Sequence, residues 1–361
     1  MRVYSLLVCA LIVPTLAGVA NAGAASWPRG EVFVPTRLFQ TKDKLDKVVL
    51  ESNPRIIVNK DFDPKSDHIL IVGMDGWGGR SENFAGTLFY GLKGGDLSKR
   101  LIVACIQDTR TRGPKYQGQG DKEHANVWRL DHQGFEAMRH FVDRLADEFG
   151  HLRVYFMGYS SGSVAAPFVA AYVAEAAVPG SKKYTVEGSI SLGVGSPIKP
   201  ERLKQNNLRV LFIVVPKQER HGFKTYGRQD NDQYKRQSAE KYADALTAGG
   251  ATAYLRYVDS AKRHFHWHWG LMSQCRYFKR NRYDDGRGYW PNYWMPNPDS
   301  YGLMSIFIQG KAPPEKLKNP PQKCPHPPNV FNPRDPDAKV SDPSRQVKWP
   351  PGTTPGDKGE P

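Results

Sequence analysis

A chain of 361 residues, of which 39% are hydrophobic, can bury a large core in one large domain or two small ones. Its formal net charge of +15 comes from basic residues scattered among acidic ones. This pattern indicates a solvated basic surface that attracts anionic molecules, and it argues against a dedicated nucleic-acid site.

The N-terminal segment has the features of an export signal. Arg2 is the only charge in the first 22 residues, an apolar run from Leu6 to Val13 follows it, and Ala20-Asn21-Ala22 supplies small residues for signal peptidase. We therefore predict that residues 1–22 are cleaved and that the mature protein is soluble and either secreted or periplasmic. The alternative is an uncleaved N-terminal anchor.

Between residues 31 and 258, apolar runs of strand length alternate with segments of helical period, the pattern of βαβ units in a mainly parallel sheet. In chain order we expect strands within Glu31–Pro35 and Lys47–Val58, a strand at His68–Gly73, a helix over 81–93, a strand at Leu101–Gln107, a helix at His132–Phe149, a strand at Val154–Met157, a helix at Val164–Ala177, strands at Ser189–Val194 and Leu208–Val215, a helix at Ser238–Leu246 and a strand at Ala253–Val258.

The C-terminal segment has a different composition. Half of the 28 prolines fall within 313–361, where there is no apolar periodicity that could build a core. We therefore expect a folded domain over 23–311 and a disordered, proline-rich tail over 312–361.

The segment Gly158-Tyr159-Ser160-Ser161-Gly162 joins an expected strand to an alanine-rich helix. Gly-x-Ser-x-Gly in this context is typical of a turn so sharp that the central residue takes a strained backbone, which only small neighbours permit. The turn thrusts the serine out of the sheet. Ser160 is therefore a candidate nucleophile for acyl transfer.

A serine hydroxyl needs a base to remove its proton, so a histidine oriented by a carboxylate should lie downstream. His264 follows shortly after the last expected strand, where a loop can bring an imidazole over the serine. The acid should follow the strand that ends near Val215. Asp230 is favoured for this role, and Glu219 and Asp232 remain open.

The oxyanion that develops in acyl transfer needs N–H donors that are fixed in advance. The backbone N–H of Ser161, directly after the candidate nucleophile, is one candidate. The other lies in the glycine-rich turn Asp75-Gly76-Trp77-Gly78-Gly79, where Trp77 or Gly78 is placed to donate.

With serine, acid and histidine in this order, residues 47–275 resemble the α/β-hydrolase superfamily. The resemblance implies an α/β fold with a mostly parallel sheet, helices on both faces, and Ser160, Asp230 and His264 as the triad. It also implies hydrolysis of a small-molecule or lipid-like carboxylic ester through an acyl-enzyme, without a cofactor. A peptidase or a thioesterase on the same fold is the nearest alternative.

Three alternating histidines provide a rival interpretation. On a strand, His264, His266 and His268 would all point the same way and could bind zinc, although no carboxylate or cysteine at ligand spacing accompanies them. A metal-dependent hydrolase or a non-catalytic binding protein would follow. Activity that survives a chelator would argue against the metal.

Two further features lie near or after the last expected strand. Aromatic residues are frequent between Phe265 and Trp294 without helical or strand period, and we interpret them as a wall or lid beside the histidine loop. Cys275 and Cys324 could form a disulfide in an oxidising compartment, whereas Cys105 lies in an apolar strand and should be buried.

Overall fold

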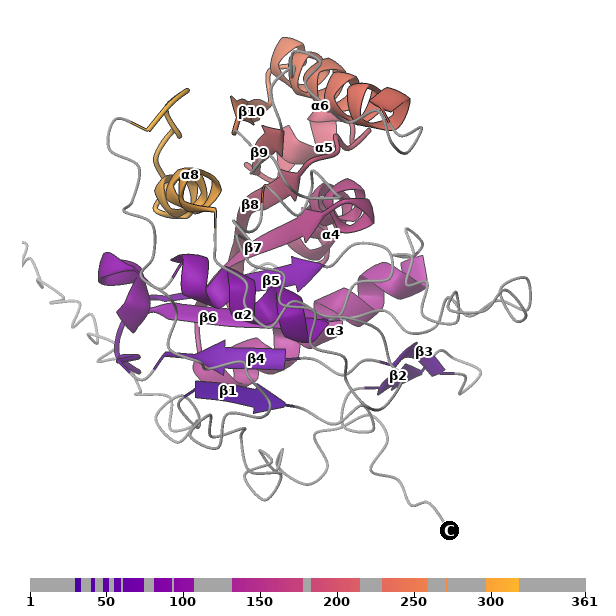
Figure 1. Cartoon of the computed structure of the whole chain (residues 1–361). Coiled ribbons are helices and arrows are strands. Elements are labelled where there is room, and N and C mark those ends of the chain that lie inside the picture. Colours follow the sequence, from indigo (N-terminus) through magenta and orange to yellow (C-terminus); the bar gives the residue numbers. More distant parts are fainter. Residues whose placement is uncertain are drawn as a thin grey trace, which may run out of the picture.

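A computed structural model describes the backbone over residues 30–33, 40–42, 48–51, 55–59, 61–74, 81–92, 94–106, 132–177, 183–214, 229–258, 271 and 297–317 (Figure 1). Its main feature is an eight-stranded sheet in the order β1-β4-β6-β5-β7-β8-β9-β10. The strands in this spatial order are β1 (Gly30–Phe33), β4 (Arg55–Val58), β6 (Leu101–Ile106), β5 (His68–Met74), β7 (Leu152–Tyr159), β8 (Tyr184–Leu192), β9 (Arg209–Val214) and β10 (Thr252–Tyr257).

The six strands from β6 to β10 in this order run parallel to one another. Only β4 opposes them, because it pairs antiparallel with both β6 and β1. The central strands are continuous apolar runs, and every residue of β5 and β6 is buried, as expected for strands covered on both faces. The carboxyl ends of the parallel strands therefore share one edge of the sheet, where sites form in open α/β folds.

Helices cover the sheet on both faces (Figure 1). One core layer joins the sheet to α3 (His132–Phe149), α4 (Ser161–Ala176), α5 (Pro200–Gln205) and α6 (Gln229–Ala248). The opposite layer joins it to α2 (Ser81–Leu92) and α8 (Pro298–Ile308). The alternation along β5 separates the layers, since Leu70 and Val72 belong to the first and Ile69 and Ile71 to the second.

The structure confirms most of the expected elements. The helix at His132–Phe149 has the expected bounds, and Gly150 ends it with a φ of 80° and an N–H bonded to the Ala146 carbonyl. The run Lys47–Val58 is instead two strands in different sheets, because β3 (Val48–Glu51) pairs only with β2 (Gln40–Lys42). Cys105 is fully buried in β6, as expected.

Sequence periodicity missed α8, which is apolar on most of its surface because the sheet and α2 both cover it. Its start signal is present in the sequence, since the Asn297 side chain accepts hydrogen bonds from the amides of Asp299 and Ser300 and Pro298 follows at the first helical position. At its other end, the Tyr155 hydroxyl donates to the Ile308 carbonyl.

The described chain continues to residue 317, past the expected domain boundary at 311. The Arg256 guanidinium on β10 donates to the Pro313 carbonyl, with 2.8 Å from its Nε, and Pro313 is buried. The expected signal peptide at 1–22, the cysteines 275 and 324, and the rest of the expected tail lie outside the described residues. No helix in the described part of the chain is long and apolar enough to cross a membrane.

Candidate active site

Ser160 lies at the carboxyl edge of the sheet, between the last residue of β7 and the first residue of α4. β7 is a central strand flanked by β5 and β8. The strand and helix expected on either side of the Gly-x-Ser-x-Gly segment are therefore both present. A side chain in this position projects beyond the sheet at the edge where ligands bind in this class of fold.

The backbone of Ser160 is strained, with φ 54° and ψ −119°. Residues other than glycine rarely adopt a positive φ. Such backbone strain costs about 1–3 kcal/mol and persists only where surrounding contacts hold the conformation. Here the Ser160 amide donates to the Leu192 carbonyl at 3.2 Å, and its own carbonyl accepts from the amide of Ser163 at 3.1 Å. Hydrogen bonds on both sides thus hold the turn.

Gly158 is required by a close approach of two chain segments. A Cβ on Gly158 would lie 2.6 Å from the Ser163 nitrogen and still closer to the carbonyl group of Gly162. Only a residue without a side chain lets β7 run into α4 at this separation. The glycine two residues before Ser160 therefore follows from backbone contact, as the sequence pattern predicted for a small neighbour.

Ser161 is the first residue of α4, so its backbone N–H is one of the amides that a helix N-terminus leaves without an intrahelical partner. This is the place at which an oxyanion donor is expected. Its Oγ is also buried and has no hydrogen-bond partner in the structure, although the side chain as a whole is only half-buried.

Three further serines, which sequence reasoning did not single out, surround the start of α4. The Ser163 Oγ donates to the Ser160 carbonyl at 2.5 Å. From the end of β8 and the segment after it, the Ser191 Oγ donates to the Ser163 carbonyl and the Ser196 Oγ donates to the Val164 carbonyl, each at 2.8 Å. All three are fully buried. A sequence signal exists for the Ser191 contact alone, because Pro167 has no N–H to donate to the Ser163 carbonyl.

The acid candidates are placed differently from expectation. We expected α6 to open at Ser238, with Asp230 in the preceding loop, but the helix begins at Gln229 and includes both Asp230 and Asp232 in its first turn. The residues before Ser238 are mostly polar, so they lack the apolar period used to detect helices, while acidic residues suit a helix N-terminus. The backbone of Asp230 is thus helical.

The remaining expected site residues lie outside the described residues. They are Trp77, Gly78, Glu219, His264, His266 and His268. Of the predicted site, the structure therefore brings together Ser160 and Ser161. Within its described ranges, no three histidine, cysteine or acidic side chains are grouped to hold a metal ion.

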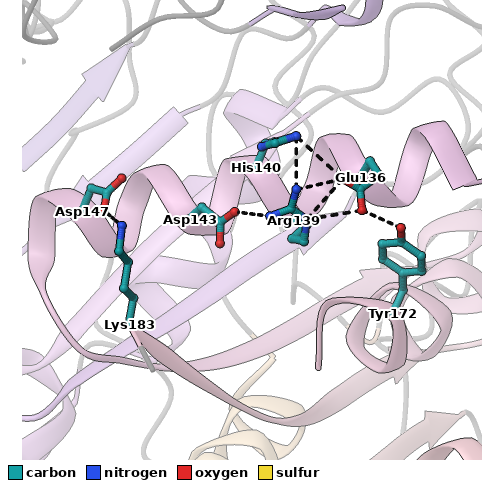
Figure 2. A network of polar contacts seen from close by, with 7 residues as sticks. All are labelled: Glu136, Arg139, His140, Asp143, Asp147, Tyr172 and Lys183. Carbon is teal, nitrogen blue, oxygen red and sulfur yellow. Dashed lines mark hydrogen bonds and ion pairs between the residues drawn. The ribbon is translucent and has the colours of Figure 1, made fainter. Parts of the chain in front are cut away.

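A polar network on α3 shifts the pKa values of two ionisable side chains, Glu136 and Tyr172 (Figure 2). Arg139 donates to both Glu136 and Asp143, and the Tyr172 hydroxyl of α4 donates to Glu136 at 2.5 Å. The Arg139 guanidinium first, and then the Tyr172 hydroxyl, lower the pKa of Glu136 to about 2. Burial and the Glu136 contact raise the pKa of Tyr172 to about 12.

This network is separate from the candidate site. Tyr172 lies about three helical turns along α4 from Ser160. The ionised Glu136 instead links α3 to α4 on the same face of the sheet, so the perturbed pKa values have a structural cause.

The fold is defined by its strand order, by β4 as the single strand opposed to the other seven, and by the strained serine between β7 and α4. It is the α/β-hydrolase fold, with a mostly parallel sheet and helices on both faces. No protein-family profile matches the sequence, and no curated protein matches it.

Several solved structures are similar to this chain. A thermostable esterase is 12% identical over 64% of this chain and 55% of its own length, with a TM-score of 0.38. Acyl-protein thioesterase 2 of Zea mays is 14% identical over 57% of this chain and 89% of its own, with a TM-score of 0.36. The acetyl xylan esterase of Aspergillus awamori is 12% identical over 51% of this chain and 71% of its own length, with a TM-score of 0.35.

The matched region spans little more than half of that first esterase. At these identities and TM-scores the likenesses carry no argument about activity. The assignment of the fold rests on the strand order and the turn at Ser160.

Proposed function

We propose that this protein is an exported serine hydrolase that cleaves carboxylic esters, with Ser160 as its nucleophile. The observation that carries the proposal is the strained backbone of Ser160 at the carboxyl edge of the sheet. Strained residues of this kind cluster at active sites. Glycine would adopt this positive φ at lower cost than serine, so the serine side chain itself is the reason for the residue at this position.

The proposed reaction has two steps. The Ser160 Oγ attacks the ester carbonyl carbon while His264, oriented by Asp230, takes its proton and passes it to the departing alkoxide. Water then attacks the acyl-enzyme with the same histidine as base, which releases the acid and restores the serine. The Ser161 N–H and a donor from the turn containing Trp77 stabilise the oxyanion in both steps.

The start of α4 supports this assignment. A helix N-terminus carries a partial positive charge and unpaired N–H groups, which suit a developing negative charge next to Ser160. The buried Leu192 and Ser163 contacts fix the turn before substrate arrives, and donors fixed in advance cost no reorganisation during the reaction. We place the substrate among small or lipid-like esters, with no cofactor.

A fluorophosphonate probe tests the nucleophile directly, because it phosphonylates an activated serine and leaves other hydroxyls unmodified. We expect a single adduct at Ser160, located by mass spectrometry of the digested protein. Ser160→Ala should lose the adduct and lower kcat on p-nitrophenyl esters by roughly 10⁶-fold, while the free energy of unfolding stays within about 1 kcal/mol.

His264→Gln should approach the loss seen with Ser160→Ala, because the members of a triad act as a unit. His266→Gln and His268→Gln should have smaller effects. A folded parent protein that takes up no probe would overturn the proposal. Equal, severe losses at all three histidines, with zinc restoring a chelated parent, would instead support the metal-dependent reading.

A further inference from the structure

Helix α4 contains a proline at its seventh residue, Pro167. In an α-helix the N–H of each residue donates to the carbonyl four residues earlier, so residue 167 should donate to Ser163. Proline has no N–H, and its ring also pushes that carbonyl away from the helix axis. The Ser163 carbonyl therefore lacks its intrahelical donor one turn after Ser160.

The hydroxyl of Ser191 supplies a donor from the neighbouring strand. Its Oγ lies 2.8 Å from the Ser163 carbonyl oxygen, and both residues are fully buried. The side chains of Ile190 and Leu192 belong to the core layer of α2 and α8. Because side chains alternate along a strand, Ser191 faces the opposite layer, in which α4 lies.

The same short stretch of β8 also holds the strained residue itself. Leu192, the next residue after Ser191, accepts the hydrogen bond of the Ser160 amide. Ser163 completes a chain of contacts, since its carbonyl accepts from Ser191 while its Oγ and amide both donate to the Ser160 carbonyl. The end of β8 thus contacts the Ser160 backbone directly at one side and through Ser163 at the other.

We propose that Ser191 is a positioning residue that replaces the amide donor missing at Pro167 and thereby fixes the orientation of Ser160. The proline converts a bond within the helix into a bond between helix and sheet. Movement of the first turn of α4 relative to β8 would rotate Ser160, so the hydroxyl couples the nucleophile to a buried strand within the sheet. This inference rests on the proposed function, in which Ser160 reacts.

The test is a double-mutant cycle of Ser191→Ala and Pro167→Ala. Alanine at 167 restores an N–H that can donate to the Ser163 carbonyl, which makes the hydroxyl of Ser191 redundant. We expect Ser191→Ala to lower the maximal rate of fluorophosphonate labelling about tenfold, since misplacement of a reacting group is costly. Because Ser191 is fully buried, the probe concentration at half-maximal rate should stay the same.

The double variant should regain most of the labelling rate, and Pro167→Ala alone should stay near the parent. Ser189→Ala is the matched control, because Ser189 is fully buried on the same strand and face but its Oγ has no partner in the structure. It should label at the parental rate. Equal rate losses in Ser191→Ala with and without Pro167→Ala would overturn the inference.

A second measurement separates this inference from the proposed function. Amide hydrogen exchange in the first turn of α4 should accelerate in Ser191→Ala and return toward the parent in the double variant, whether or not the protein is an enzyme. If the parent protein takes up no probe, the proposed function is contradicted, but the hydrogen-exchange result still tests the role of Ser191. If Ser191→Ala does not fold, Ser191→Cys takes its place, since a thiol fills similar space but donates weakly.

Discussion

Gly158 shows why this turn tolerates so few residues. The carbonyl group of Gly162 lies where a side chain on Gly158 would begin, so the backbone of β7 packs directly against the first turn of α4. Ser160 is forced between them into a positive φ. The position of Ser160 thus depends on a residue that has no side chain, Gly158.

We expect Gly158→Ala to lower the free energy of unfolding by about 2–3 kcal/mol and to abolish labelling of Ser160, because the added methyl must displace α4. Urea unfolding and probe labelling measure the two effects. Gly94→Ala is the matched control, since an added Cβ there meets nothing within 4 Å and its φ of −77° suits alanine. Equal urea concentrations at the midpoint of unfolding for the two variants would contradict the steric argument.

At the scale of elements, α3 and α4 are joined by an ionised carboxylate as well as by their apolar faces (Figure 2). Glu136 contacts Arg139 on its own helix and Tyr172 on the neighbouring one. Both contacts favour the charged carboxylate, so they keep its pKa near 2 instead of the ordinary 4.5. The link between the helices therefore depends on pH.

The direction in which stability changes with pH follows from the lowered pKa of Glu136. Glu136 binds a proton more weakly in the folded protein than in the unfolded chain, so its contribution to stability is complete above pH 4.5 and is lost as the pH falls toward 2. We expect Glu136→Gln to be less stable than the parent at pH 7 and to lose less stability between these pH values. Denaturant unfolding over this pH range measures the difference.

Tyr172→Phe provides a graded comparison, because it keeps the ring packed near Phe135 but removes one hydrogen bond to the carboxylate. Its loss of stability with falling pH should lie between those of the parent and Glu136→Gln. A pH dependence of Glu136→Gln identical to that of the parent would show that this carboxylate is not responsible.

At the scale of the whole molecule, α8, the last helix that the structure describes, completes the second core layer. α8 covers the face of the sheet shared with α2, and its last carbonyls are held by side chains from two strands. The Arg209 guanidinium donates to the Phe307 carbonyl and to the Tyr155 hydroxyl, which itself donates to Ile308. The segment beyond is then held by Arg256 on β10. Residues far apart in sequence thus close the second core layer.

Truncation tests where the folded domain ends. We expect a chain that ends after Leu317 to unfold at the same denaturant concentration as the full chain, because the proline-rich segment beyond it has no apolar pattern for a core. A chain that ends after Lys311 loses the Pro313 carbonyl and leaves Arg256 without that acceptor. It should be less stable by about 1–3 kcal/mol. A large loss in the longer truncation would show that the tail contributes to the fold.

The sequence by itself determined the elements whose signals are local. The helix His132–Phe149 was predicted with its observed bounds because its apolar spacing and its terminal glycine lie within the element. The strained turn at Ser160 was predicted for the same reason, since the glycines that mark it are two residues away on either side, and the structure shows that Gly158 has no room for a side chain. The role of Ser160 as nucleophile, and those of His264 and Asp230, stay predictions.

Only the tertiary structure decided which elements meet and what the buried polar side chains do. Ser189 and Ser191 are two serines on the same face of β8, and their sequence context is alike. One hydroxyl has no partner in the structure and the other donates to the start of α4. The difference arises because Pro167, which leaves an acceptor open, belongs to another element, and the order of strands in the sheet brings that acceptor to Ser191.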